Sequence, residues 1–311
     1  MVRPEFSHGI HIHAEKLAGL RVLAPLLPLH KQKKILHGQS GGHISRLRGR
    51  GIDFSEVREY QAGDDIRSMD WRVTARTGEA HIKVFREERE RPVLVACDLR
   101  AAMNFGTRRT LKKVLAADIA ALLAWSANGH GDRVGGLIFN DEQEFDLRPN
   151  SGRKTLMAFL HQLSAMPLSK HQPAHVRMLQ MCRHIARIAR PGTAIYIVSD
   201  WHGFDAECER ALFATSRHCD IVAIHVSDPF ERNLAAGQLT LSDGIGQQIL
   251  QGNRETVQKH QAQWDARLNA LNEHLLPLRS SLTTVTTQQD PLEVLRLGLG
   301  VMSQGVRGRL L

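Results

Sequence analysis

Two aspartates in this chain each follow directly on a short apolar run. Asp98 follows the run over residues 93–97, and Asp200 follows the strand pattern over residues 193–199. Apolar runs of this length are typical of strands buried in a parallel sheet, and open α/β sheets bind ligands at the carboxyl ends of their strands. Two carboxylates at that edge could hold a hard divalent cation. The alternative is that each aspartate caps the turn or helix that follows it.

Strand and helix patterns alternate through the part of the chain that would position these aspartates. Helical spacing is expected over residues 110–128, 153–165, 176–189, 205–216, 254–275 and 291–299. Strands are expected over 93–97, 133–139, 193–199, 220–226 and 281–286, with an antiparallel edge strand over 143–147 and a hairpin over 238–241 and 247–250. This alternation predicts an α/β fold with a doubly wound, mostly parallel sheet.

The first 91 residues differ in character. An apolar stretch over 17–27 predicts a short amphipathic helix that ends near Ala24, because Pro25 disfavours helix in the residue before it. A highly charged stretch of mixed sign follows, in which Trp71 is expected to anchor packing. We therefore expect two domains, a smaller charged module over 1–91 and an α/β domain over 92–311. One interpretation of residues 1–40 is a flexible basic arm.

The net charge of +9 and the pI of about 9.8 arise mostly before residue 51. A basic cluster of this kind could meet nucleic acid, anionic lipid or an acidic protein surface. The alternative is a solubilising, partly disordered arm. Nucleic-acid binding is the less favoured outcome, because aromatic residues make up only 5% of the chain and are not interleaved with the basic ones.

Several classes of protein are disfavoured by absent signals. The four cysteines are irregularly spaced without a C-x-x-C pair, which indicates reduced thiols rather than zinc or disulfides. No apolar run approaches the roughly 20 residues of a membrane span, and no secretory signal is recognised, so we expect a cytoplasmic protein. A complete phosphate-binding loop and a G-x-S-x-G elbow are both missing from the sequence. We therefore expect neither ATP binding nor catalysis by this chain.

Residues 49–78 read GRGIDFSEVREYQAGDDIRSMDWRVTARTG, and a run of charges over 87–91 leads into the strand that ends at Asp98. This sequence strongly resembles domain-of-unknown-function family 58, and the resemblance covers about residues 43–140. It implies a von Willebrand factor A-type domain behind a charged N-terminal region. It also implies an association with MoxR-type AAA+ ATPases, as adaptors in the assembly or maturation of protein complexes.

The resemblance also implies a metal site, from which this chain departs. The A-type motif is Asp-x-Ser-x-Ser, followed by a threonine from a later loop and a further aspartate. Here the motif begins with Asp98, but Arg100 and Ala102 replace the two serines. Asp200 matches the later aspartate, whereas Thr155, or Ser151 nearby, matches the threonine only loosely. If a metal such as Mg²⁺ binds, its ligands would be Asp98, Asp200 and Thr155.

Arg100 changes the electrostatics expected at this site. A guanidinium about 4 Å from a divalent ion would repel it by at most about 8 kcal/mol at an effective dielectric constant near 20. We therefore expect a degenerate site without a required metal, in which Arg100 pairs in a bidentate contact with Asp98 or Asp200.

The leading hypothesis is a non-catalytic adaptor that works with a MoxR-type AAA+ ATPase. Its expected contact face is the degenerate metal site, with Asp98, Arg100, Ala102, Asn104 and Asp200. Two alternatives stay open. One is a metal-dependent hydrolase or phosphoryl-transfer enzyme that uses the two aspartates, and the other is nonspecific nucleic-acid binding through the basic segment. The client protein and the oligomeric state do not follow from the sequence.

Overall fold

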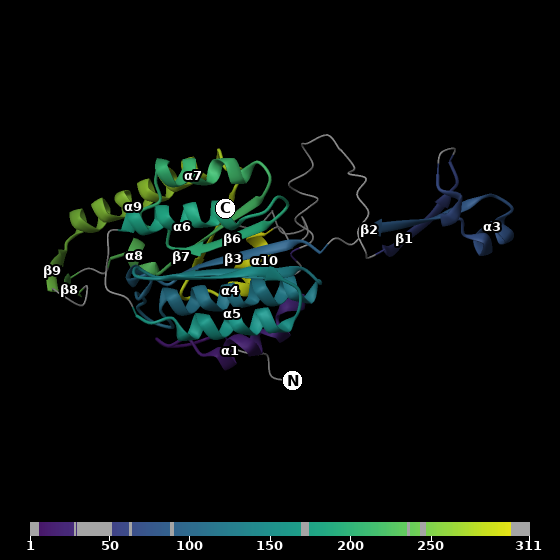
Figure 1. Ribbon diagram of the computed structural model, residues 1–311. Helices are drawn as coiled ribbons and strands as arrows, with labels where there is room; N and C mark the ends of the chain where they lie inside the picture. Colours follow the sequence, from purple (N-terminus) through teal and green to yellow (C-terminus); the bar gives the residue numbers. More distant parts are fainter. Residues whose placement is uncertain are drawn as a thin grey trace. The chain divides into compact units, whose positions relative to one another are not determined.

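The computed structural model describes residues 6–27, 29, 52–61, 64–87, 90–168, 174–234, 237–242 and 247–299 (Figure 1). The chain forms two compact units, of which the larger combines residues 1–39 with 91–311 and the smaller spans 40–90.

A six-stranded sheet forms the centre of the larger unit. Its strands are β3 (Pro92–Asp98), β4 (Arg133–Phe139), β5 (Glu144–Asn150), β6 (Ala194–Ser199), β7 (Asp220–Ser227) and β10 (Ser281–Thr286), in the order β10-β7-β6-β3-β4-β5. All neighbours pair in parallel except the edge strand β5, which runs antiparallel to β4. The strand order reverses between β3 and β6, as in doubly wound folds. The predicted doubly wound, mostly parallel sheet is confirmed, including its antiparallel edge strand.

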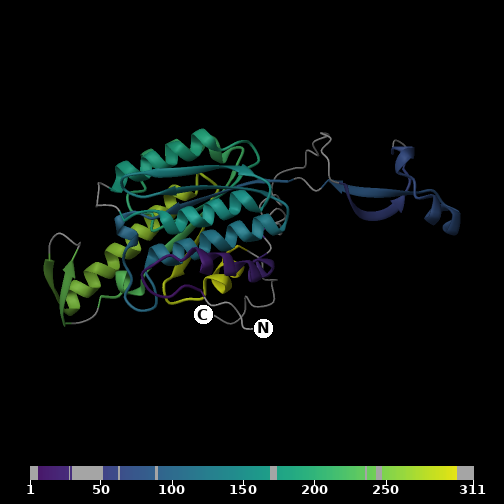
Figure 2. The ribbon, with the colours of Figure 1, turned by 60° about the horizontal axis from the view of Figure 1, so that its bottom comes forward.

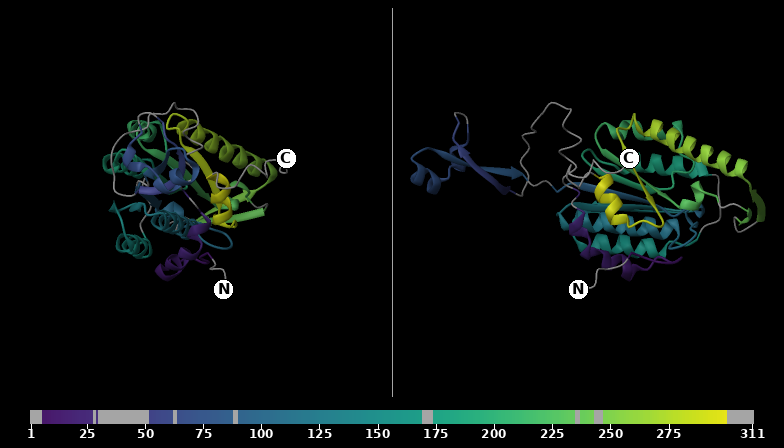
Figure 3. Two further views of the ribbon diagram at one scale, coloured as in Figure 1. Left: turned by 90° about the vertical axis from the view of Figure 1, so that its right-hand side faces the viewer. Right: turned by 180° about the vertical axis from the view of Figure 1, so that it is seen from behind.

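Side chains of the sheet alternate between two cores, because successive residues of a strand point to opposite faces. In β3, Val93, Val95 and Cys97 belong to one core, whereas Leu94 and Ala96 belong to the other. The helices are α4 (Lys112–Gly129), α5 (Arg153–Ala165) and α10 (Pro291–Gly298) on the first face, and α6 (Ala174–Ile188), α7 (Ala206–Ser216) and α9 (Arg254–Leu275) on the second. Figures 1 and 3 show these two layers of helices on either side of the sheet.

The helix α4 is buried around nearly its whole circumference. Its residues from Val114 to Ala127 are all buried, although the sequence contains the charged Asp118 among them. A helix that is apolar on all sides must be covered by other elements on each of them. The sheet covers one side of α4, and α5, α10 and the N-terminal segment cover the rest.

The N-terminal segment supplies part of that cover. The helix α1 (Ala14–Gly19) and the short helical turns η1 (Leu20–Val22) and η2 (Ala24–Leu26) lie along α4 and α5 (Figure 2). Leu17, Leu20 and Leu23 are almost fully buried there, and the Trp125 Nε1 donates to the Leu17 carbonyl over 3.0 Å. The predicted grouping of residues 1–91 as one module, with a flexible arm over 1–40, is therefore wrong for residues 6–27. Their apolar side chains belong to the α/β core, while residues 30–51 lie outside the described residues.

A buried carboxylate fastens the start of this segment to α4. Asp118 accepts hydrogen bonds from the backbone N–H of Ser7 over 2.7 Å and from its hydroxyl over 2.8 Å. Burial raises the pKa of Asp118 to about 6, although the two Ser7 hydrogen bonds act in the opposite direction. The folded-state pKa thus lies above the unfolded value of 3.8, so the folded state binds more protons between these two values.

We expect the stability contributed by Asp118 to fall as the pH rises from about 4 to about 6 and to stay constant above that range. Measured against Asp118→Asn, which does not titrate, the wild type should lose on the order of 3 kcal/mol of unfolding free energy between pH 3.5 and pH 7.5. Urea denaturation of both proteins across this range tests the prediction. A difference between them that does not change with pH would contradict it.

The smaller unit is built on an antiparallel strand pair, β1 (Ile52–Glu59) and β2 (His81–Glu87). Between the strands, Asp70 caps α3 (Trp71–Thr77) through the backbone N–H groups of Arg72 and Val73, and Gly78 ends it with a φ of 82°. The Trp71 side chain is 68% exposed. Within this unit, Trp71 therefore does not anchor packing as expected, because most of its side chain is left uncovered at the start of α3.

The remaining predicted elements are present. The strands β8 (Gly237–Ser242) and β9 (Gln247–Gly252) form the expected antiparallel hairpin, and the single turn α8 (Pro229–Arg232) follows β7. Among the described helices, none combines the length and the apolar composition that crossing a membrane would require. All four cysteines are buried free thiols.

Candidate functional site

Asp98 and Asp200 lie at the same edge of the sheet. Asp98 ends β3 and Asp200 directly follows β6. The two strands are neighbours, and their register pairs Cys97, just before Asp98, with Val198, two residues before Asp200. These two strands are the neighbours between which the strand order reverses, the place at which open α/β sheets bind ligands. The structure therefore brings the two predicted carboxylates together, as the sequence analysis expected.

Arg100 folds back onto Asp98. Its Nη2 lies 2.7 Å from Asp98 Oδ2, its Nε lies 3.0 Å from Oδ1, and its backbone N–H donates to Oδ1 over 2.9 Å. The guanidinium also donates to the His202 carbonyl over 3.1 Å and approaches Asp200 Oδ1 to 3.5 Å. Asp98 and Arg100 are 0% and 1% exposed. The predicted bidentate pairing of Arg100 with Asp98 is thus present in the structure.

A second cation completes the arrangement. Lys112, in the first turn of α4, places its Nζ 3.0 Å from Asp200 Oδ2 and 2.7 Å from Glu231 Oε1. The Lys112 side chain is 2% exposed, although it carries a charge. Arg100, Lys112, Asp98, Asp200 and Glu231 thus form one buried network of two cations and three carboxylates, called the strand-end network below.

The charges of this network stabilise one another. Burial raises the pKa of Asp200, but Lys112 and Arg100 outweigh this effect and hold that pKa well below its usual range. Burial likewise lowers the pKa of Lys112, yet Asp200 and Glu231 raise it above its ordinary value. Burial also raises the pKa of Glu231, an effect that Lys112 only partly offsets. The strand-end network is therefore expected to keep its two cations charged at neutral pH.

Two local structures hold the strand-end network in place. Trp201 adopts the left-handed conformation, with a φ of 58°, and its buried indole donates to the Ile224 carbonyl over 3.2 Å. This turn lets the backbone N–H of His202 donate to Asp200 over 3.0 Å. Asp228 and Glu231 form a capping box at the start of α8, which orients the Glu231 carboxylate. Strained backbone of this kind costs about 1–3 kcal/mol, so the surrounding contacts must stabilise it.

The residues present do not fit a divalent cation. The carboxylate oxygens of Asp98 that a metal would use already accept from Arg100 and from the Ser199 hydroxyl, which lies 2.6 Å from Oδ2. Asp200 is occupied in the same way by Lys112 and His202. Within the described part of the chain, no three His, Cys, Asp or Glu residues are grouped so that they could hold a metal ion.

Thr155, the predicted third ligand, lies at the other edge of the sheet. The antiparallel strand β5 ends at Asn150, which pairs with Val134 at the start of β4. Ser151 and the first turn of α5 therefore follow at the amino-terminal edge, away from Asp98. The prediction of a metal ligand at Thr155 or Ser151 is wrong, because the antiparallel direction of β5 carries the chain to the opposite end of the strands.

Most of the residues predicted to contact a partner protein have buried side chains. Asp98 and Arg100 are too deeply buried to touch another protein in this structure, and the Asp200 side chain is only 8% exposed. Ala102 and Asn104 are half-buried on the loop that follows Arg100. The prediction of Asp98 and Arg100 as contact residues is therefore wrong, because the two side chains pair with each other inside the protein.

An open groove lies beside the strand-end network. One cavity of about 450 Å³ is lined by Lys112, Asp200 and Glu231 together with Trp264 and Arg267 of α9. A second cavity of about 260 Å³ shares Glu231, Trp264 and Arg267 with the first. The second cavity is lined mainly by large apolar and aromatic side chains: Phe105, Phe230, Leu234 and Trp264. The two cavities share the three lining residues Glu231, Trp264 and Arg267 and are together called the carboxyl-edge groove below.

Three members of this site were not predicted from the sequence. Lys112 interrupts an apolar run at the start of α4, and this interruption was its one visible signal. Glu231 lies within a capping box that begins at Asp228, a pattern that is visible in the sequence but indicates a helix start rather than an ion pair. Trp264 carries no local signal, because α9 reads as an ordinary amphipathic helix.

The family model described as "Protein of unknown function DUF58" matches residues 56–269, so the chain belongs to that family. Two curated relatives are uncharacterized proteins, Mb1516 of Mycobacterium bovis and Rv1480 of Mycobacterium tuberculosis. Each is 34% identical over 231 residues, which cover 73% of this chain and 70% of the relative.

Solved structures were compared with the chain as well. The conserved hypothetical protein BatB from Bacteroides thetaiotaomicron is 15% identical, with a TM-score of 0.43, and covers 67% of this chain and 97% of its own. A von Willebrand factor type A protein from Catenulispora acidiphila is 9% identical, with a TM-score of 0.37, and covers 71% and 43% respectively.

Proposed function

We propose that this protein is a non-catalytic interaction adaptor that works with a MoxR-type AAA+ ATPase in the assembly or maturation of protein complexes. One observation supports this proposal above the others. At the edge where α/β sheets bind ligands, the carboxylates are paired with cations of the same chain, and an aromatic groove opens beside them. The polar groups there are engaged with one another, so the groove offers surface for binding rather than free groups for chemistry.

The chemistry of the carboxyl-edge groove fits a protein segment. Phe105 and Phe230 lie with their ring centroids 6.4 Å apart, and Trp264 is half-buried in the same wall. Aromatic and arginine side chains are the residues that most often dominate binding energy at protein interfaces. Arg267 is exposed beside them and favours an acidic residue in the partner. We therefore propose that the groove binds a segment of the ATPase that carries an apolar anchor next to an acidic side chain.

Two groove substitutions test this proposal against a matched control. We expect Trp264→Ala to weaken binding of the purified ATPase at least about 10-fold, as truncation of a central aromatic anchor does. Arg267→Glu should weaken it as well, because the charge reverses. Arg210→Glu lies outside the groove on α7, with a side chain that is 74% exposed, and should bind like the wild type. Interferometry with the ATPase in its ATP-bound state measures all four affinities.

Other outcomes would contradict the adaptor proposal. Crosslinked purification from the native cell that recovers the protein alone, while the ATPase is expressed, would remove its main support. A magnesium-dependent phosphoester hydrolysis that is lost in Asp98→Asn would favour the enzyme alternative, in which Asp98 and Asp200 would first have to leave Arg100 and Lys112.

A further inference from the structure

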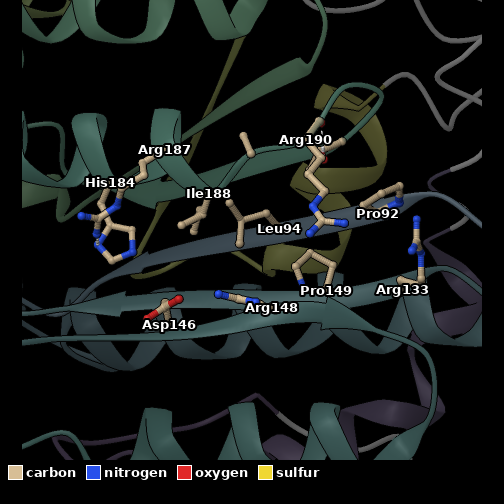
Figure 4. A pocket seen from close by; sticks show the side chains of 12 residues that line it. Pro92, Leu94, Arg133, Asp146, Arg148, Pro149, His184, Arg187, Ile188 and Arg190 are labelled. Carbon is tan, nitrogen blue, oxygen red and sulfur yellow. Dashed lines mark hydrogen bonds between the residues drawn. The ribbon is translucent and has the colours of Figure 1, made fainter.

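A separate cavity lies at the opposite edge of the sheet from the strand-end network. It has a volume of about 560 Å³ and opens over the first residues of β3 and β4, under the end of α6 (Figure 4). Four arginines line it: Arg133 from β4, Arg148 from β5, Arg187 from α6 and Arg190 from the loop after α6. The function proposed above does not involve this cavity.

Among the described residues, the four arginines have no carboxylate partner. In the part of the chain that the structure describes, none of them forms an ion pair with a carboxylate, and the Nε of Arg133 is buried without a hydrogen-bond partner. Arg187 has one side-chain contact, 3.3 Å from Nη2 to the Nδ1 of His184. By contrast, Arg91 nearby pairs with Asp220. Guanidinium groups gathered around one cavity repel each other unless an anion lies between them.

The acidic and titratable groups of the cavity leave its charge positive. Asp146 is the one carboxylate in its lining. His184 also lines it, and its Nδ1 lies 2.6 Å from Glu144 Oε1, so that carboxylate is already engaged. Four guanidinium groups thus face a single free carboxylate.

Apart from Thr193, the rest of the lining is apolar. Leu94 and Ile188 form its inner surface, and Pro92 and Pro149 flank the arginines. In Figure 4 the Arg190 side chain extends from the loop after α6 toward Pro149, while Arg133 and Arg148 lie on the strands below. The cavity therefore combines an apolar surface with arginines contributed from both its helical and its strand side.

We propose that this cavity binds a small organic phosphate of nucleotide size. Planar guanidinium groups bind phosphate oxygens in bidentate pairs, and four of them match a ligand with more than one phosphate charge. A volume of about 560 Å³ is within the range of small-molecule sites, roughly 300–1,000 Å³. The apolar surface formed by Leu94, Ile188 and Pro149 packs against the organic part of the ligand.

Calorimetric titration of the full-length protein with ADP, pyrophosphate and adenosine tests the proposal. We expect saturable binding of ADP, weaker binding of pyrophosphate and none of adenosine, because the arginines recognise the phosphates. Arg148→Gln and Arg190→Gln should each weaken ADP binding at least about 10-fold, which is the loss of one charge-assisted hydrogen-bonded pair. Both arginines are exposed, so neither substitution is expected to unfold the protein.

Two further variants distinguish this site from general attraction of anions. Arg210→Gln removes the same positive charge as the two cavity variants, but from an exposed side chain on α7, and should leave ADP binding unchanged. Asp146→Asn removes the free carboxylate of the lining and should tighten ADP binding. Absence of saturable ADP and pyrophosphate binding at millimolar concentration would overturn the proposal. So would ADP binding that Arg148→Gln and Arg190→Gln leave unchanged, or a preference for a phosphoserine peptide over ADP.

Discussion

Replacing Arg100 with methionine is expected to lower the free energy of unfolding by about 3–5 kcal/mol. Methionine keeps much of the side-chain volume but leaves the fully buried carboxylate of Asp98 without its cation. Asp98 would keep only the hydrogen bonds from the Ser199 hydroxyl and the backbone N–H of residue 100. Removal of one member of a buried ion pair is among the most destabilising single substitutions, because the remaining charge can neither return to water nor find another partner.

Guanidinium denaturation at pH 7 measures this effect, with Arg210→Met as the matched control. Arg210 is largely exposed, forms a 3.9 Å ion pair with Glu207 and donates from Nε to the Ala206 carbonyl over 3.2 Å. Because these contacts are exposed to solvent, its replacement should change the unfolding free energy by less than about 1 kcal/mol. The double variant Asp98→Asn/Arg100→Met should recover part of the loss, since it removes both charges of the pair. A single variant Arg100→Met as stable as Arg210→Met would show that the pairing contributes nothing to the folded state.

Truncating Leu17 to alanine is expected to lower the unfolding free energy by about 2–5 kcal/mol, the range for a buried leucine whose cavity cannot close. Leu17 is 0% exposed and packs with the core around α4, and its carbonyl accepts from the Trp125 indole. The substitution removes three carbon atoms that pack against α4. The helix cannot shift to fill the resulting cavity, because the sheet holds its opposite side.

The same substitution at Leu26 is the natural comparison, because Leu26 lies in the same segment and is 46% exposed. Leu26→Ala should cost less than about 1 kcal/mol. Equal effects of Leu17→Ala and Leu26→Ala in urea denaturation would mean that the segment does not pack on α4 in solution, and would restore the interpretation of residues 1–40 as a flexible arm.

The fold could be predicted from the sequence wherever the spacing of apolar residues along the chain indicates a strand or a helix. The strands β3, β6 and β7 are buried on both faces, so their apolar runs stand out, and the helices α4 and α9 were placed within two residues of their observed ends. The strand β1 was not predicted, since its residues 52–59 are mostly charged or polar and show no clear alternation. The packing of residues 6–27 was also missed, because the apolar stretch over 17–27 indicates an amphipathic helix but not the surface on which it packs.

The sequence by itself determined the two strand-end aspartates, the alternation that places them at one edge and the replacement of the motif serines by Arg100 and Ala102. Only the tertiary structure decided that Lys112 completes the site, since Asp200 and Glu231 follow it by 88 and 119 residues. The four arginines that line the cavity of about 560 Å³ likewise come from three elements and a loop. A local pattern reports the period of a helix or strand and its caps, whereas the partner of a charge depends on which loops the sheet brings together.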